Sequence, residues 1–167
     1  MAGLVRRVKG WVASPAVKLR DARKLIAKGR LAEAFALLGQ AAQAGLAEAE
    51  FLVARCYLEG AGVPPSAAEG ARWLERSANQ GYVEAQTAMA ALFLRGIAIA
   101  DGGAEAGGDA AVLGRPAGAL FATSETAAPD FARAMQWARK AADAGSADGQ
   151  ALLAYLLTSG PEEARDL

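Results

Sequence analysis

The chain of 167 residues contains no histidine and only one cysteine, Cys56. Without histidine, it lacks the side chain that most often serves as a general base or metal ligand near neutral pH. It also has no C-x-x-C pair, no Cys/His cluster and no glycine-rich phosphate loop. We therefore expect a protein that is not an enzyme, with no catalytic residue, metal ion, cofactor or small-molecule substrate.

Long apolar runs are missing as well. No window approaches the roughly 18 uninterrupted apolar residues that a membrane-spanning helix needs. Near the N-terminus, Arg6, Arg7 and Lys9 interrupt the apolar stretch that a signal peptide would require. Cys56 is alone, so an intramolecular disulfide cannot form and an oxidising compartment is not required. We expect a cytoplasmic protein.

Aromatic residues are scarce, at 7% of the chain, and the hydrophobic fraction of 53% owes much to alanine. Alanine has the highest helix propensity, and its small side chain lets helix backbones approach closely. The composition therefore predicts an all-α fold.

Charge is unevenly distributed along a chain whose formal net charge is zero. Residues 1–30 contain nine Lys or Arg and one acid, Asp21, so the remainder is equally acidic. A basic beginning on an acidic body favours an anionic partner or surface for the first residues. We do not expect a nucleic-acid-binding protein.

Three copies of one pattern align when Gly45, Gly81 and Gly145 are taken as the origin. Small residues precede each glycine, an acid follows it by three positions, and glycine returns fifteen positions later. The copies are 36 and then 64 residues apart, which is one further period plus 28 inserted residues.

Each copy predicts a helix, a turn, a second helix and a glycine turn. Offsets 4, 7, 8, 11 and 12 from the origin form an apolar stripe with helical spacing, and we expect this stripe to face the core. In the three copies it consists of Ala49, Leu52, Val53, Cys56 and Tyr57; Ala85, Ala88, Met89, Leu92 and Phe93; and Gly149, Leu152, Leu153, Leu156 and Leu157. Ser66 and Asp130, each after a proline, are the expected N-caps of the second helices.

The repeats divide the chain into five predicted parts. These are a basic amphipathic helix at 1–14, a leading tetratricopeptide-like helix pair at 15–45, a repeat at 46–81, a repeat at 82–145 with a Gly/Ala-rich insertion at about 97–129, and the first helix of an incomplete repeat at 146–167. Terminal units of a stacked array are often atypical, because one face has no neighbour. We expect the chain to be a piece of a longer repeat protein.

Leu46 to Gly81, LAEAEFLVARCYLEGAGVPPSAAEGARWLERSANQG, resembles a complete Sel-one-like repeat of the tetratricopeptide superfamily. The G-x-G-V turn at Gly60, Gly62 and Val63 carries the resemblance, together with Trp73. The resemblance implies a right-handed α-solenoid of stacked antiparallel helix pairs. It also implies a bacterial, cytoplasmic scaffold or adaptor that binds a partner protein or peptide on its concave face. The alternative is a regulatory or targeting portion of a larger enzyme or envelope-associated machine.

The side of the first helices opposite the apolar stripe is the expected binding surface, which in this family lines the concave groove. Aromatic and arginine side chains are frequent anchors of protein interfaces. The candidate partner-binding residues are Phe51, Arg55, Glu59, Thr87, Arg95 and Tyr155. Packing against neighbouring repeats is the alternative role for these side chains.

Residues 3–13 place apolar side chains on one helical face, apart from Arg6, Arg7 and Lys9. Trp11 suits a membrane boundary, and the pattern is typical of a short interfacial helix. It is equally typical of a helix that caps the first repeat. We favour the cap, and retain weak contact with a membrane or another anionic surface through Arg6, Arg7, Lys9 and Trp11.

The remaining features have plainer interpretations. Trp73 and Trp137 recur at one offset and are expected to pack between helices, while Cys56 is expected to be a buried, unreactive thiol. The insertion is expected to be a mobile loop. A calcium loop at 101–105 is the sharper alternative, but its spacing fits neither an EF-hand nor a nonapeptide repeat.

Overall fold

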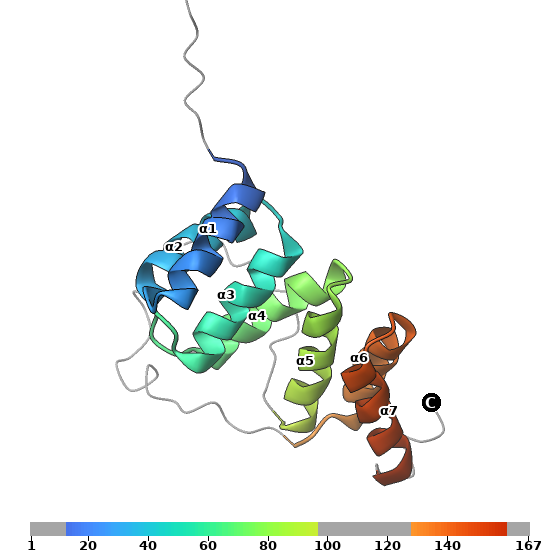
Figure 1. Cartoon of the computed structure of the whole chain (residues 1–167). Helices are drawn as coiled ribbons and strands as arrows, with labels where there is room; N and C mark the ends of the chain where they lie inside the picture. The colour runs from blue at the N-terminus through green and yellow to red at the C-terminus, as the bar shows by residue number, and fades with distance from the viewer. Residues whose placement is uncertain (1–12, 97–127, 160–167) are drawn as a thin grey trace, which may run out of the picture.

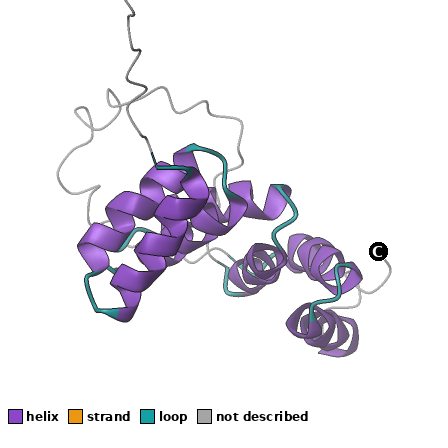
Figure 2. Ribbon diagram, turned by 45° about the horizontal axis from the view of Figure 1, so that its top comes forward, coloured by secondary structure: helices purple, strands orange, loops and turns teal. Residues whose placement is uncertain are grey.

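The computed structural model describes residues 13–96 and 128–159. Within these ranges the chain forms seven helices and no strand (Figures 1 and 2). The helices are α1 (Pro15–Ala27), α2 (Leu31–Gln43), α3 (Ala47–Glu59), α4 (Ala67–Asn79), α5 (Val83–Leu94), α6 (Phe131–Asp143) and α7 (Ala147–Ser159). The all-α prediction is confirmed.

Side-chain caps fix where four of these helices begin, and the hydroxyl of Ser146 caps α7 by accepting a hydrogen bond from the amide of Gly149 at 3.0 Å. The hydroxyl of Ser66 accepts a hydrogen bond from the amide of Glu69 at 3.3 Å, and the carboxylate of Asp130 accepts one from the amide of Arg133 at 2.9 Å. Ser14 caps α1 in the same way. Each cap satisfies a backbone N–H that has no partner within its helix. The two N-caps predicted from the sequence are therefore confirmed.

Glycine turns follow the second helix of each pair. Gly45, Gly81 and Gly145 have φ angles of 82°, 87° and 87°. This left-handed conformation is strained for residues with a side chain and lets the chain reverse just after a helix ends. These are the three glycines on which the repeats align in the sequence.

The helices stack in sequence order, each packed against the next, and α5 also contacts α7. Helices α1 and α2, α3 and α4, and α5 and α6 form successive hairpins (Figure 1). In Figure 2 the N-terminal helices lie lengthwise, whereas those near the C-terminal end are seen nearly end-on, so the helix axes rotate along the array.

The core consists of two clusters of buried side chains. One gathers around Leu38 and Val53 in α1, α2 and α3, and the other around Leu74 and Met89 and extends to α7. Trp73 packs against both clusters, which agrees with its predicted role between helices. Many of the buried residues are alanines, so close helix contacts replace bulky side chains in this core.

The apolar stripe of the first helices is largely buried, with two departures. Leu157 was expected to face the core but is 42% exposed, because no helix follows α7 in the described residues to cover it. The other is Glu50, which lies beside the stripe at offset 5 and is fully buried although it carries a charge. Its carboxylate forms an ion pair with Arg76 of α4 at 3.0 Å and accepts a hydrogen bond from Gln80, the C-cap of that helix.

Candidate functional site

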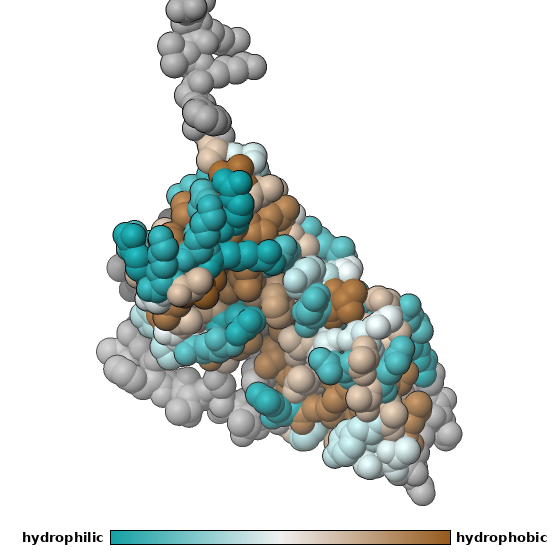
Figure 3. Space-filling view, in the orientation of Figure 1, coloured by the Kyte–Doolittle hydropathy of each residue, from teal (hydrophilic) through white to brown (hydrophobic). Residues whose placement is uncertain are grey.

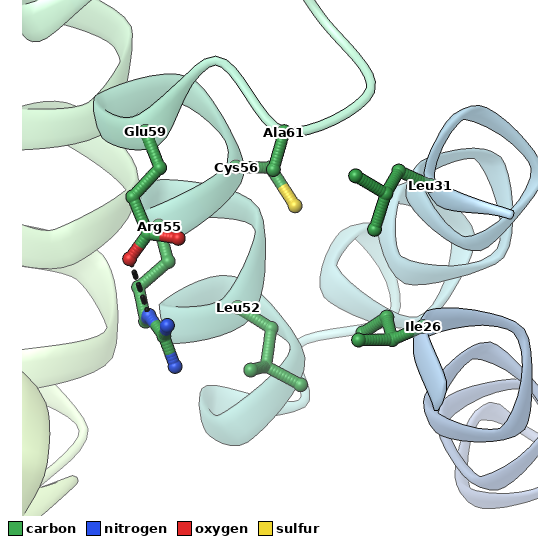
Figure 4. A pocket seen from close by; sticks show the side chains of 7 residues that line it. All are labelled: Ile26, Leu31, Leu52, Arg55, Cys56, Glu59 and Ala61. Carbon is green, nitrogen blue, oxygen red and sulfur yellow. Dashed lines mark hydrogen bonds and ion pairs between the residues drawn. The ribbon is translucent and has the colours of Figure 1, made fainter. Parts of the chain in front are cut away.

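A small hollow opens between the first helix pair and α3. Its volume is about 270 Å³, and below it is named the α1–α3 hollow. It is lined by Ile26, Leu31, Leu52, Arg55, Cys56, Glu59 and Ala61. Figure 4 shows Ile26 and Leu31 on one side, facing Leu52 and Cys56 on the other. Ile26 and Leu31 are each 38% exposed, so apolar surface is accessible at this site.

The turn between α3 and α4 places one wall of the hollow. Gly60 and Gly62 both have positive φ, at 71° and 82°. A β-carbon at Gly62 would stand 2.6 Å from the backbone carbonyl of Leu31, so the turn lies directly against the start of α2. Ala61, between the two glycines, thereby reaches the hollow together with Leu31. The G-x-G-V turn, which resembles that of the family repeat, therefore forms one wall of this site.

Arg55 and Glu59 supply the charged groups of the hollow. Their side chains form an ion pair at 3.0 Å between successive turns of α3 (Figure 4). Both side chains are about half exposed, at 51% and 54%. Exposed ion pairs of this kind contribute roughly 0–1 kcal/mol to stability. A charged group of a partner could therefore replace Arg55 or Glu59 in the pair at little cost in free energy. The structure thus places these two predicted residues together at the hollow.

Phe51 and Thr87 lie one repeat apart and make equivalent contacts. The ring of Phe51 lies 5.3 Å from the ring of Tyr82, which precedes α5. The hydroxyl of Thr87 lies 3.2 Å from that of Ser146, which precedes α7. Both side chains are half-buried against the next first helix, and the two contacts therefore link successive repeats.

Arg95 and Tyr155 complete the predicted set. Arg95 is exposed at the C-cap of α5, and Tyr155 is 55% exposed on α7. Neither lines the α1–α3 hollow. Arg55, Glu59, Arg95 and Tyr155 are thus the members of the set whose side chains reach solvent.

Some sequence predictions fall outside the described residues. Arg6, Arg7, Lys9 and Trp11 belong to residues 1–12, and the calcium-loop alternative belongs to 97–127. Among the residues that the structure does describe, no group of His, Cys, Asp and Glu could hold a metal ion.

Cys56 is the nucleophilic side chain of the hollow, and its surroundings oppose reactivity. The residue is buried, with 9% of its surface exposed. Burial raises the pKa of the thiol, and the nearby charge of Glu59 raises it further, against a smaller opposing effect of Arg55. Since the thiolate is the nucleophilic form, the thiol remains protonated and weakly nucleophilic at neutral pH.

The apolar half of the site was not predicted from the sequence. Ile26 and Leu31 were assigned to helices without a surface role, and Leu52 was assigned to the core. Ile26 and Leu31 flank the turn at Gly29, but nothing in this local pattern marks them as exposed. Their meeting with α3 depends on the path of the chain at Gly62, which no local pattern specifies.

Fold and surface together define an all-α helical repeat protein with an apolar hollow on its first helices. The model of the Sel1 repeat family matches residues 47–82 and 120–146. The first match covers α3 and α4, and the second ends just after α6. The chain therefore contains Sel1-like repeats. Sel1 repeat proteins generally act as protein-interaction scaffolds and are typically non-catalytic.

Two solved structures are similar in fold. A Sel1 repeat protein from Oxalobacter formigenes has a TM-score of 0.64 at 22% identity, covering 87% of this chain and 50% of that one. A protective antigen of uropathogenic Escherichia coli strains, which displays an SLR fold, has a TM-score of 0.62 at 23% identity, covering 90% of this chain and 27% of that one. The chain thus spans half or less of the length of these proteins.

No curated protein matches the chain significantly. Among the helices that the structure describes, none combines the length and apolar character needed to cross a bilayer.

Proposed function

We propose that the protein is a non-catalytic scaffold or adaptor that binds a partner protein or peptide through the face formed by its first helices. The α1–α3 hollow is the observation that carries this proposal. There, accessible Ile26 and Leu31 lie across from an exposed arginine, Arg55. Apolar surface combined with arginine is typical of the residues that contribute most to protein-protein binding.

The rest of this face supports the same proposal. Arg95 and Tyr155 present further arginine and aromatic side chains on α5 and α7, so a long partner segment could contact successive repeats. Repeat proteins commonly use such extended surfaces. Phe51 and Thr87 connect successive repeats along the proposed surface, through their contacts with Tyr82 and Ser146.

The size of the hollow favours a protein partner over a small molecule. Small-molecule sites usually enclose roughly 300–1,000 Å³ and bury most of their ligand. At about 270 Å³, the hollow lies at the lower limit of that range, and its lining includes the exposed side chains of Ile26 and Leu31, which leave it accessible to a protein surface. We propose neither a cofactor nor a small-molecule substrate, and no nucleic-acid partner. The proposed location is cytoplasmic, with peripheral membrane contact through the N-terminal residues as an additional feature.

Photo-crosslinking from defined positions tests the proposal. A photoreactive phenylalanine analogue would replace Arg55 or Tyr155 on the proposed face, and Arg72 or Gln136 on the second helices as controls. All four side chains are exposed. We expect discrete crosslinked partners from positions 55 and 155 in cells that express the protein. Crosslinks to a specific partner from positions 72 and 136 alone would place the binding surface on the second helices instead.

A further inference from the structure

Two basic residues lie at or near the α1–α3 hollow, and one of them has no acidic partner among the described residues. Lys28, at the C-cap of α1, lies in the turn between Ile26 and Leu31. It is exposed, and no described acidic side chain forms an ion pair with it. Arg55, across the hollow, is paired only through the exposed contact with Glu59. Lys28 is thus close in the chain to two lining residues, and Arg55 is itself a lining residue.

The first helix pair, beside this site, also carries an excess of positive charge. Residues 15–45, which form α1, α2 and their turns, contain six basic and two acidic side chains. Residues 46–96 contain four basic and six acidic side chains, and residues 128–159 contain three of each. Among the described ranges, the excess of positive charge is therefore confined to the first helix pair, and Figure 3 shows hydrophilic side chains gathered over that end of the molecule.

The apolar lining determines what can enter the hollow. Its volume of about 270 Å³ and its facing side chains, Ile26, Leu31 and Leu52, suit one or two aliphatic side chains of a peptide. Burial of such a side chain contributes about 1.5–3 kcal/mol, which is too little for stable binding without additional contacts. Carboxylates beside the anchor would gain those contacts from Lys28 and Arg55.

We propose that the α1–α3 hollow binds an acidic peptide segment of a partner protein, with an aliphatic side chain in the hollow and flanking Asp or Glu residues beside Lys28 and Arg55. The inference rests on the proposed function and specifies the chemistry of the partner. Complementary charge also raises the rate of encounter and makes binding sensitive to salt.

A random library of twelve-residue peptides displayed on phage, selected on the full chain, tests this chemistry. We expect enriched peptides to carry a Leu, Ile, Val or Met flanked by Asp or Glu. When these enriched peptides are synthesised with a fluorescent label, they should bind the protein more weakly as the salt concentration rises. The Lys28→Glu variant should weaken binding about threefold or more, a change equivalent to an exposed charge pair. Ala61→Phe should abolish binding by filling the hollow, with circular dichroism confirming that each variant is folded.

Lys18→Glu is the matched control. It makes the same change in net charge ten residues earlier on α1, about 15 Å along the helix from Lys28, and should leave the affinity within twofold. If enriched peptides are neutral or basic yet lose binding in Ala61→Phe, the hollow binds peptides but the acidic partner is wrong. If no peptide is enriched, or Ala61→Phe leaves binding intact, the hollow is not the docking site. The proposed function would then depend on the crosslinks from Tyr155.

Discussion

The amide nitrogen of Asp130 donates a hydrogen bond to the carbonyl oxygen of Phe93 at 3.0 Å. One repeat earlier, the amide of Ser66 donates to the carbonyl of Tyr57 at 2.9 Å. The two pairs occupy equivalent positions, although 28 more residues separate Phe93 from Asp130 than separate Tyr57 from Ser66. The same backbone hydrogen bond therefore joins the two helices of the repeat whether or not the inserted residues lie between them.

This equivalence predicts that the insertion can be removed. Replacing residues 96–129 with the six-residue sequence of 60–65, GAGVPP, restores the shorter connection. The fold should be retained, and the shorter loop should raise the free energy of unfolding by about 1.5 kcal/mol, because loop-closure entropy costs about 0.6 kcal/mol per doubling of length. Urea denaturation followed by circular dichroism measures the change. A loss of several kcal/mol would show that inserted residues belong to the core.

A second prediction concerns the contact between Gly62 and Leu31. Gly62→Ala should destabilise the protein by more than 1 kcal/mol, because it adds a backbone clash to the strain of a positive φ. Gly81→Ala is the matched control. Gly81 also has a positive φ, but an added β-carbon there would meet nothing within 4 Å. In thermal melts, the melting temperature of Gly62→Ala should be lower than that of Gly81→Ala. Equal melting temperatures would contradict the close packing of the turn on α2.

The sequence predicted the helices well because their ends are encoded locally. Ser66 and Asp130 cap helices through contacts three residues away, and Gly81 ends one through its own backbone angle. Glu50 could not be predicted in this way. Its burial depends on Arg76 and Gln80, which only the α3–α4 hairpin brings to it. The apolar side of the hollow was missed for the same reason, since it is formed by contacts distant in sequence.

Burial of Glu50 makes a pH-dependent contribution to stability. Desolvation raises the pKa of this carboxyl, against smaller opposing effects of Arg76 and Gln80. A carboxyl whose pKa is raised in the folded state stabilises the fold at pH values below the ordinary pKa of glutamate. This stabilisation is lost as the pH rises through the pKa of Glu50 in the folded state. Relative to wild type, the Glu50→Gln variant should therefore gain stability between about pH 4 and pH 7.

The second repeat offers a reciprocal variant for this test. Gln86 occupies the same offset as Glu50 and is also buried, with its amide donating to the carbonyl of Ala78 at 3.3 Å. Gln86→Glu should lose stability relative to wild type over the same pH range, because it introduces a buried carboxylate. Urea denaturation at several pH values measures both differences. A difference between wild type and Glu50→Gln that stays constant or reverses would show that the pair with Arg76 outweighs desolvation.

The last prediction separates residues that bind from residues that hold the fold together. Replacing both Arg55 and Tyr155 with alanine should weaken binding of the crosslinked partner while changing the free energy of unfolding by less than about 1 kcal/mol. Arg55 contributes only an exposed ion pair, and Tyr155 is 55% exposed. Trp73→Ala should do the reverse, with a loss of about 3 kcal/mol, since Trp73 packs against both core clusters.

Thermal melts paired with affinity measurements distinguish the two classes of variant. Each affinity should be measured at a temperature where the variant is folded, so that unfolding is not mistaken for lost binding. If the Arg55 and Tyr155 double variant melts as early as Trp73→Ala and yet binds normally when folded, the first-helix face is not the binding surface. The partner would then be expected to bind the basic N-terminal residues or the insertion, because these are the remaining distinctive segments of the chain.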